Sequence, residues 1–136
     1  MNINNIMRLE DLQIGDWIWN WDAEDVKHPY QVTRETFSLS DYDIANLEPI
    51  HITREFLKKN GFEFGDGTVS ITCPDESGVI QHTFTFRLLV KIWDENIVSG
   101  LRYNIFESNY VDIEDVHDLQ HLLRTLYVND DFKIVV

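Results

Sequence analysis

The first fifty residues alternate between apolar and polar positions with a period of two, which is typical of short strands. The clearest case is residues 17–21, where three tryptophans fall on one side of an extended chain and the residues between them on the other. The alternation recurs in residues 30–34, and residues 46–53 add a further extended segment. Because turn-forming residues separate these segments, the pattern predicts a small barrel-like β lobe over residues 1–50.

A short helix is predicted next, between Thr53 as its N-cap and Asn60-Gly61 as its stop. Beyond it the period of two returns in three runs separated by turns: residues 65–73, 79–93 and 101–107. The longest run carries a continuous apolar face: Phe84, Phe86, Leu88 and Val90. One apolar and one polar face predict an antiparallel sheet that is covered on one side.

The pattern changes to a helical period over residues 114–128. At about 100° per residue, six apolar side chains form one stripe: Val116, Leu119, Leu122, Leu123, Leu126 and Tyr127. We expect this stripe to pack on the apolar face of the sheet, and residues 132–136 suggest a last strand. The predicted fold class is therefore α+β, a single domain over residues 1–136. Its N-terminal barrel-like lobe, residues 1–50, packs on an antiparallel sheet with one main C-terminal helix in residues 51–136.

Charge is the outlier in the composition, with 24 acidic against 11 basic residues and a net charge of −13. Nucleic-acid binding depends on Lys and Arg displacing counterions from phosphates, so we expect no nucleic-acid partner. The longest acidic tract, residues 107–118, precedes the predicted helix, where acids cap free N–H groups. Solubility accounts for much of the acidity, and the alternative is a surface for a basic partner, even one that mimics DNA.

The chain has no apolar run close to the roughly 20 residues that cross a bilayer. It begins without the basic and apolar segments of a signal peptide, and its single cysteine, Cys73, cannot form an internal disulfide. We therefore expect a cytoplasmic protein without a membrane partner.

The segment VHDLQHLL places His117 and His121 four residues apart on the predicted helix, a spacing that metal sites use. A helical projection puts both on the polar side, with Gln120 at its edge. A zinc-protease helix needs Glu after the first histidine, whereas this chain has Asp118, and no third ligand stands in a recognisable motif. We therefore expect a solvated surface on which His117 or Gln120 bonds a neighbouring loop. No metal, cofactor or catalytic residue is predicted.

The row of tryptophans is the most unusual local feature. A flat aromatic row on a strand can stack bases, sugars or a proline-rich peptide. Base stacking normally comes with a cationic groove, but the flanking residues here include Asp16 and Asp22. We therefore expect the row to fill the core or an interface. The candidate interaction residues are Trp17, Trp19, Trp21, His117 and Gln120.

Three segments in the same order and spacing resemble a family of short uncharacterised proteins of Bacteroides-type gut bacteria and their phages or mobile elements. The first is Leu-x-x-Gly at Leu12 and Gly15. The second, a Pro-Ile-x-x-Thr-x-Glu-x-Leu-x-x-x-Gly-Phe-like segment, matches at Pro49, Ile50, Glu55, Leu57, Gly61 and Phe62. The third is Val-His-x-Leu-Gln-x-Leu at Val116, His117, Leu119, Gln120 and Leu122. The resemblance brings no activity or cofactor, and it implies an accessory protein of a mobile element.

The sequence does not identify an activity. We expect a non-enzymatic acidic accessory protein that binds another protein carrying a basic patch. One alternative is a small metal- or small-molecule-dependent enzyme that uses the His117 region. Another is an acidic mimic of nucleic acid.

Overall fold

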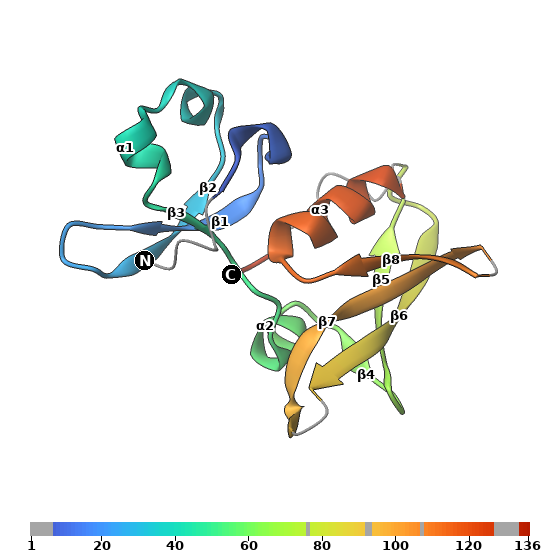
Figure 1. Cartoon of the computed structure of the whole chain (residues 1–136). Coiled ribbons are helices and arrows are strands. Elements are labelled where there is room, and N and C mark those ends of the chain that lie inside the picture. Colours follow the sequence, from blue (N-terminus) through green and yellow to red (C-terminus); the bar gives the residue numbers. More distant parts are fainter. Residues whose placement is uncertain (1–6, 76, 92–93, 107, 127–133) are drawn as a thin grey trace. The chain divides into compact units, whose positions relative to one another are not determined.

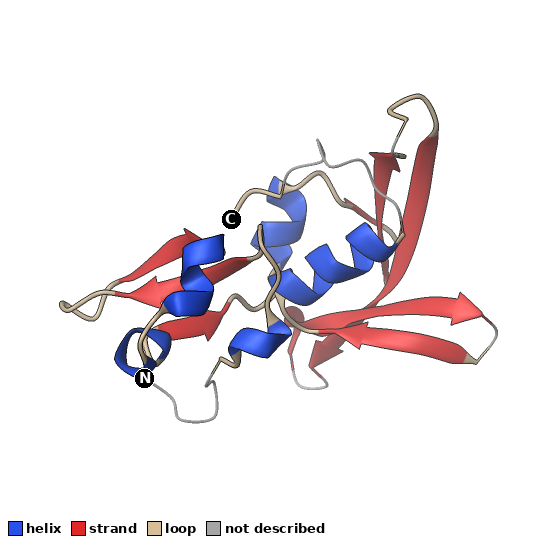
Figure 2. Ribbon diagram, turned by 90° about the horizontal axis from the view of Figure 1, so that it is seen from above, coloured by secondary structure: helices blue, strands red, loops and turns tan. Residues whose placement is uncertain are grey.

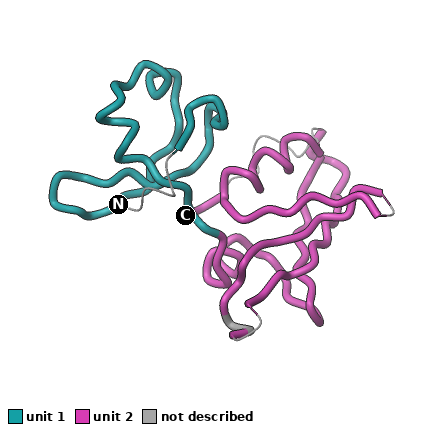
Figure 3. The backbone as a smooth tube through the Cα atoms, viewed as in Figure 1, with its two compact units in different colours: residues 1–51, 136 teal, residues 52–135 magenta. Residues whose placement is uncertain are grey.

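The computed structural model describes residues 7–75, 77–91, 94–106, 108–126 and 134–136. The chain divides into two compact units (Figure 3). Unit 1 comprises residues 1–51 with residue 136, and unit 2 comprises residues 52–135. Each unit has its own antiparallel sheet, and helices accompany both, so the predicted α+β class is confirmed.

The sheet of unit 1 has three strands in the order β2-β1-β3. Strand β1 (Trp17–Trp21) lies in the centre and pairs antiparallel with β2 (Lys27–Gln31) and with β3 (Leu47–Pro49). Both outer strands are edges, so the sheet is open. The predicted barrel is corrected to an open sheet, because the segment between β2 and β3 folds into helical turns instead of further strands.

The described part of unit 1 has three short helical segments: the 3-10 helices η2 (Leu9–Asp11) and η3 (Arg34–Ser38), and helix α1 (Asp41–Ile44). The strand predicted over residues 30–34 is wrong beyond Gln31, because Thr33 and Thr36 cap η3 reciprocally. The Thr33 N–H donates to Oγ1 of Thr36 at 2.9 Å. This local hydrogen bonding competes with a sheet ladder, as threonines at turns commonly do.

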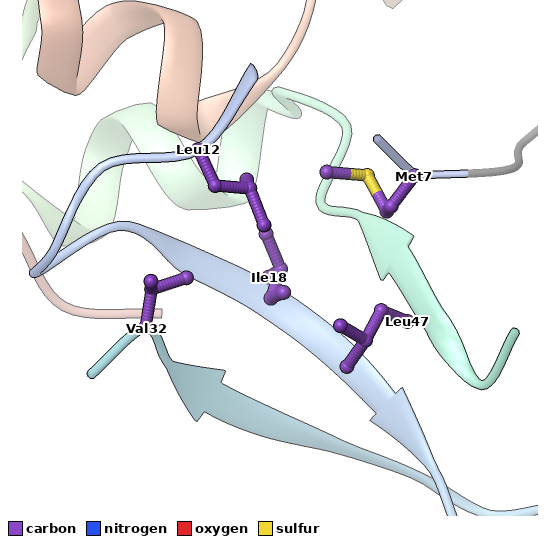
Figure 4. Close-up of a cluster of buried hydrophobic side chains, with 5 residues drawn as sticks. All are labelled: Met7, Leu12, Ile18, Val32 and Leu47. Atoms are coloured by element: carbon purple, nitrogen blue, oxygen red, sulfur yellow. The ribbon is translucent and has the colours of Figure 1, made fainter. Parts of the chain in front are cut away.

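The core of unit 1 lies on one face of its sheet (Figure 4). Its buried members are Met7, Leu12, Ile18, Val32 and Leu47. Ile18 is fully buried at the centre of β1, whereas its neighbours Trp17 and Trp19 are only half-buried. Alternation along the strand thus directs the aliphatic residue, and not the tryptophans, into the core.

Unit 2 holds a five-stranded antiparallel sheet in the order β4-β5-β6-β7-β8. The strands are β4 (Glu63–Phe64), β5 (Thr68–Pro74), β6 (Gln81–Lys91), β7 (Asp94–Phe106) and β8 (Asn109–Ile113). The predicted meander over β5, β6 and β7 is confirmed in order, but residues 94–100, which we expected to form the turn before the last strand, belong to β7. Strand β8 was not expected, because it lies inside the acidic tract that we assigned to the approach of the helix.

Two helices complete unit 2 (Figures 1 and 2). Helix α2 (Arg54–Lys59) begins where predicted, since Oγ1 of Thr53 accepts the N–H of Phe56 at 3.1 Å. It ends before Gly61, whose φ of 80° is the left-handed stop that the sequence indicated. Helix α3 (Val116–Thr125) lies against one face of the sheet.

The predicted helix over residues 114–128 is therefore shorter at its N-terminus, and residues 127–128 lie outside the described residues. Residues 132–133 of the suggested last strand also lie outside them, and residues 134–136 are not in a strand. No helix in the described part of the chain is long and apolar enough to cross a membrane.

The two apolar rows that we predicted to pack together are both withdrawn from solvent. Phe86 of β6 and Val116 and Leu119 of α3 are fully buried. The remaining members of the two rows are buried or half-buried: Phe84, Leu88, Val90, Leu123 and Leu126. The opposite face of the sheet is polar, as predicted, and hydroxyl pairs cross it, with Oγ1 of Thr72 and Thr83 2.8 Å apart.

Candidate functional site

The tryptophan row occupies the face of the unit 1 sheet that is opposite Ile18. Trp17, Trp19 and Trp21 are each half-buried, so the row does not fill the core of unit 1, and its place at an interface stays a prediction. Ile18 lies in the core instead. The row therefore lies at an aromatic face that is neither core nor fully exposed.

Two charged side chains of unit 1, those of Lys27 and Glu48, contact this aromatic face. The Lys27 ammonium lies 4.8 Å from the ring centroid of Trp19 and 5.9 Å from that of Trp21. The indole N–H of Trp21 donates to the carboxylate of Glu48 on β3. Because a cation of the chain itself covers two of the rings, the row is poorly suited to stacking bases or a further cation.

Unit 1 also contains a cavity of about 310 Å³. Its apolar wall consists of Trp21, Tyr30, Leu39 and Leu47, and its polar wall of Asn20, Asp43 and Asn46. All three strands of the sheet and helix α1 contribute to it. The ring of Trp21 lies on the opposite face of the sheet, where its indole N–H bonds Glu48. The cavity thus combines the ring of Tyr30, a carboxylate and two side-chain amides within one unit.

Hydrogen bonds hold the lining residues in place. The Tyr30 hydroxyl lies 2.7 Å from Oγ1 of Thr36, and the backbone N–H of Trp21 donates to the backbone carbonyl of Asn46 at 2.9 Å. The carboxylate of Asp43 accepts the hydroxyl of Ser40 at 3.1 Å. Because strands and a capped helix fix these atoms, the cavity is part of the folded unit and does not depend on a loop closing over it.

Acidic residues surround this part of the chain. Unit 1 has ten acidic and three basic residues. The turn between β1 and β2 carries Asp22, Glu24 and Asp25, all exposed. A hydrogen bond from His28 at 2.7 Å, together with backbone N–H groups of the turn, holds the pKa of Asp22 below its usual value. Asp22 therefore keeps its negative charge to lower pH than an isolated carboxyl would.

Helix α3 differs from expectation on its polar side. His117 and Gln120 are buried, with exposed fractions of 6% and 9%, whereas His121 is half-buried and Arg124 is exposed. The predicted solvated surface is therefore wrong for His117 and Gln120. In the first two turns of α3, polar residues next to the apolar stripe are buried as well, so the buried surface of the helix is wider than the stripe.

A cluster of potential metal ligands forms at the beginning of α3. One donor atom each from Asp115, His117 and Asp118 lies within 4.8 Å of the others. Nε2 of His117 is 3.6 Å from a carboxylate oxygen of Asp118, and its buried Nδ1 has no hydrogen-bond partner among the described residues. The ring of His121 instead meets that of His117 edge-on, with centroids 5.7 Å apart. The sequence pointed to the histidine pair, but the structure groups His117 with two carboxylates.

Cys73 is fully buried in β5. Burial raises the pKa of its thiol to about 11. The thiolate is therefore scarce at neutral pH.

Comparison with models of protein families, with curated proteins and with solved structures finds no match. The arguments on function therefore rest on the geometry and charge of the chain itself.

Proposed function

We propose that the protein is a non-enzymatic binding module that holds another protein through a basic segment of that partner, and that unit 1 carries the binding surface. One observation carries the proposal: a cavity with aromatic, amide and carboxylate walls lies in a unit with ten acidic and only three basic residues. Such a surface attracts positive charge and offers a place for a side chain to insert.

The charge supports a basic partner for kinetic as well as energetic reasons. A surface of one sign raises the rate at which an oppositely charged partner arrives, and salt weakens this effect. The same surface repels the phosphate backbone of nucleic acids, which bind proteins that offer basic stripes. A protein is therefore favoured over DNA or RNA as the partner.

The setting that fits this role is the cytoplasm of a bacterium, as an accessory protein of a phage or mobile element. Its support is the resemblance carried by the three short segments, together with a lone cysteine that is buried in a strand. A protein of that kind acts by holding a host or element protein, which needs no catalytic group.

The test is a binding titration with defined peptides of equal length whose net positive charge rises in steps, followed by fluorescence anisotropy. We expect affinity to rise with peptide charge and to fall as salt is added, because charges beyond about 8 Å are screened at physiological ionic strength. Random-sequence DNA and RNA oligonucleotides should not bind. Tight binding of either nucleic acid contradicts the proposal.

Two double variants locate the surface. Glu24→Gln with Asp41→Asn removes two exposed charges from unit 1, and Glu63→Gln with Asp66→Asn removes two from unit 2. Removal from unit 1 should weaken binding roughly two- to fivefold per charge, the scale of an exposed ion pair. The unit 2 variant is the matched control, and equal losses in both would show that the net charge alone decides binding.

A second candidate function rests on the cluster at the beginning of α3. A histidine and two carboxylates suit a first-row divalent ion and leave a coordination position open, as in a metal-dependent enzyme that uses the His117 region. Elemental analysis of the purified protein separates the two candidates. The binding module is expected to hold no stoichiometric zinc. One ion per chain that is lost in Asp118→Asn but kept in His121→Ala would replace our proposal with the enzyme.

A further inference from the structure

The cavity of unit 1 has the size of one long side chain. Its volume of about 310 Å³ is at the lower end of ligand pockets, which begin near about 300 Å³. Leu39 and Leu47 offer aliphatic surface, and Tyr30 offers ring surface. A chain of methylene groups that ends in a flat polar head matches such a lining.

The polar wall selects the charge of that head. Asp43 forms no ion pair with a basic side chain among the described residues, and the hydroxyl of Ser40 is its side-chain contact. A carboxylate beside an aromatic ring and without a cation of its own favours a positively charged guest. An anionic guest would meet both this carboxylate and the excess of acids in unit 1.

The amides favour a guanidinium over an ammonium. The side-chain nitrogen of Asn46 donates to the Tyr42 carbonyl at 3.2 Å, so its oxygen is left to accept. Together with the carboxylate of Asp43 and the amide oxygen of Asn20, the wall offers several acceptors in different directions. A guanidinium has five donors in one plane and stacks on aromatic rings, whereas an ammonium is a compact and strongly hydrated point charge.

We infer that this cavity is the receptor for an arginine side chain of the basic partner. The inference rests on the proposed function and adds to it the residue that is recognised. In it, Asp43 pairs with the guanidinium, the ring of Tyr30 lines its path, and the amides of Asn20 and Asn46 accept its remaining donors. The acids of the neighbouring turn contribute attraction at longer range.

The test uses the full-length protein and a short basic peptide with a single central arginine, and the same peptide with lysine at that position. We expect the arginine peptide to bind at least tenfold more tightly, because lysine keeps the charge but loses the bidentate geometry. The ring signals of Tyr30 and the side-chain amide signals of Asn20 and Asn46 should shift in two-dimensional NMR spectra when the arginine peptide is added. Equal affinity of the two peptides would overturn the inference.

Two variants on the same short helix provide a matched pair. Both residues are exposed, but they differ in place. Asp43→Asn removes the carboxylate from the cavity while its backbone N–H still caps onto Ser40, and Asp41→Asn removes a carboxylate that does not line the cavity. We expect Asp43→Asn to weaken the arginine peptide tenfold or more, the effect of losing a hydrogen bond between charged groups, and Asp41→Asn to weaken it less than threefold. Circular dichroism confirms that both variants are folded.

The outcomes separate the two proposals. If basic peptides bind but both variants lose affinity equally, the surface binds by diffuse charge and the arginine receptor is refuted, while the proposed function stands. If no basic peptide binds, both fail. Free arginine amide is the last ligand to test. If it binds as tightly as the peptide, the cavity is a guanidinium site, but the inference that the guanidinium comes from a protein segment is refuted.

Discussion

Replacing Phe86 with alanine tests the packing of unit 2 most directly. Its ring is fully buried in β6, tilted against Phe62 at 6.3 Å and against Tyr103 at 5.4 Å between centroids. Truncating a buried phenylalanine costs about 3–5 kcal/mol, because apolar contacts are lost and a cavity remains. Since small domains unfold with about 5–15 kcal/mol, Phe86→Ala should lose a large part of the stability of this unit.

Urea denaturation followed by circular dichroism measures the change. With a dependence on urea of about 2 kcal/mol per molar, a loss of about 4 kcal/mol lowers the midpoint by about 2 M. Phe106→Ala is the matched control, since it removes the same ring from β7 in the same sheet but at a position that is 67% exposed. Its effect should stay within about 0.5 kcal/mol.

Equal shifts for the two variants would refute the reasoning. They would mean that Phe86 does not face the core, and a strand shifted by one residue is the simplest physical cause, because it moves every side chain of β6 to the opposite face. Thr85 and Arg87 would then lie inside, where Thr85→Val would stabilise the protein. In the register described here, both are exposed.

Three further predictions test other parts of the chain. A Cβ on Gly100 would lie 2.7 Å from the Ile113 carbonyl oxygen, so Gly100→Ala should cost about 1–3 kcal/mol in thermal or urea unfolding, whereas Ser99→Ala should not. The thiol of Cys73, with its pKa raised to about 11, should react with a disulfide reagent far more slowly in the native protein than in urea, and equal rates would contradict its burial. NMR titration should give Asp22 a pKa below its usual 3.8, and this pKa should rise in His28→Ala. The lowered pKa stabilises the folded protein at pH values above 3.8, and this stability is lost as the pH falls through the pKa of the folded state.

Local chemistry made much of unit 2 predictable from the sequence. Alternation of apolar and polar residues identified β5, β6 and β7, because each of these strands has one face in the core. The ends of α2 followed from Thr53 and Gly61, whose roles depend only on neighbouring backbone groups. Such signals act over a few residues and need no knowledge of the tertiary structure.

The parts that were missed depend on contacts between distant residues. Closure of a barrel requires edge strands to meet, and no periodicity reports whether β2 and β3 do so. Burial of His117 and Gln120 depends on what surrounds the beginning of α3, which a helical projection cannot contain. Strand β8 was hidden because Asp112 gives the tract its acidic character, although the alternating Val111 and Ile113 carried the strand signal.

The sequence did not predict the cavity, and Trp21 is the only lining residue among the predicted interaction residues. Its wall is assembled from three strands and from α1, a helix too short to show a period. One local signal existed: Ser40 three residues before Asp43 is a capping pattern, and the Ser40 hydroxyl does accept the Asp43 N–H. That signal could have revealed the helix, but not the strands that it faces.

The tryptophan row and the cavity are rival binding surfaces on opposite faces of the unit 1 sheet. A partner held by the row would gain mainly from apolar area, so its affinity would persist at high salt and would fall equally in Trp19→Phe and Trp21→Phe. A partner held at the cavity gains from Asp43, so its affinity should fall with salt and in Asp43→Asn, but not in Trp19→Phe or Trp21→Phe. The structure favours the second pattern, because Lys27 already covers the rings of the row while Asp43 forms no ion pair with a described residue. Charge then brings the basic partner to unit 1, and the cavity decides which side chain it accepts.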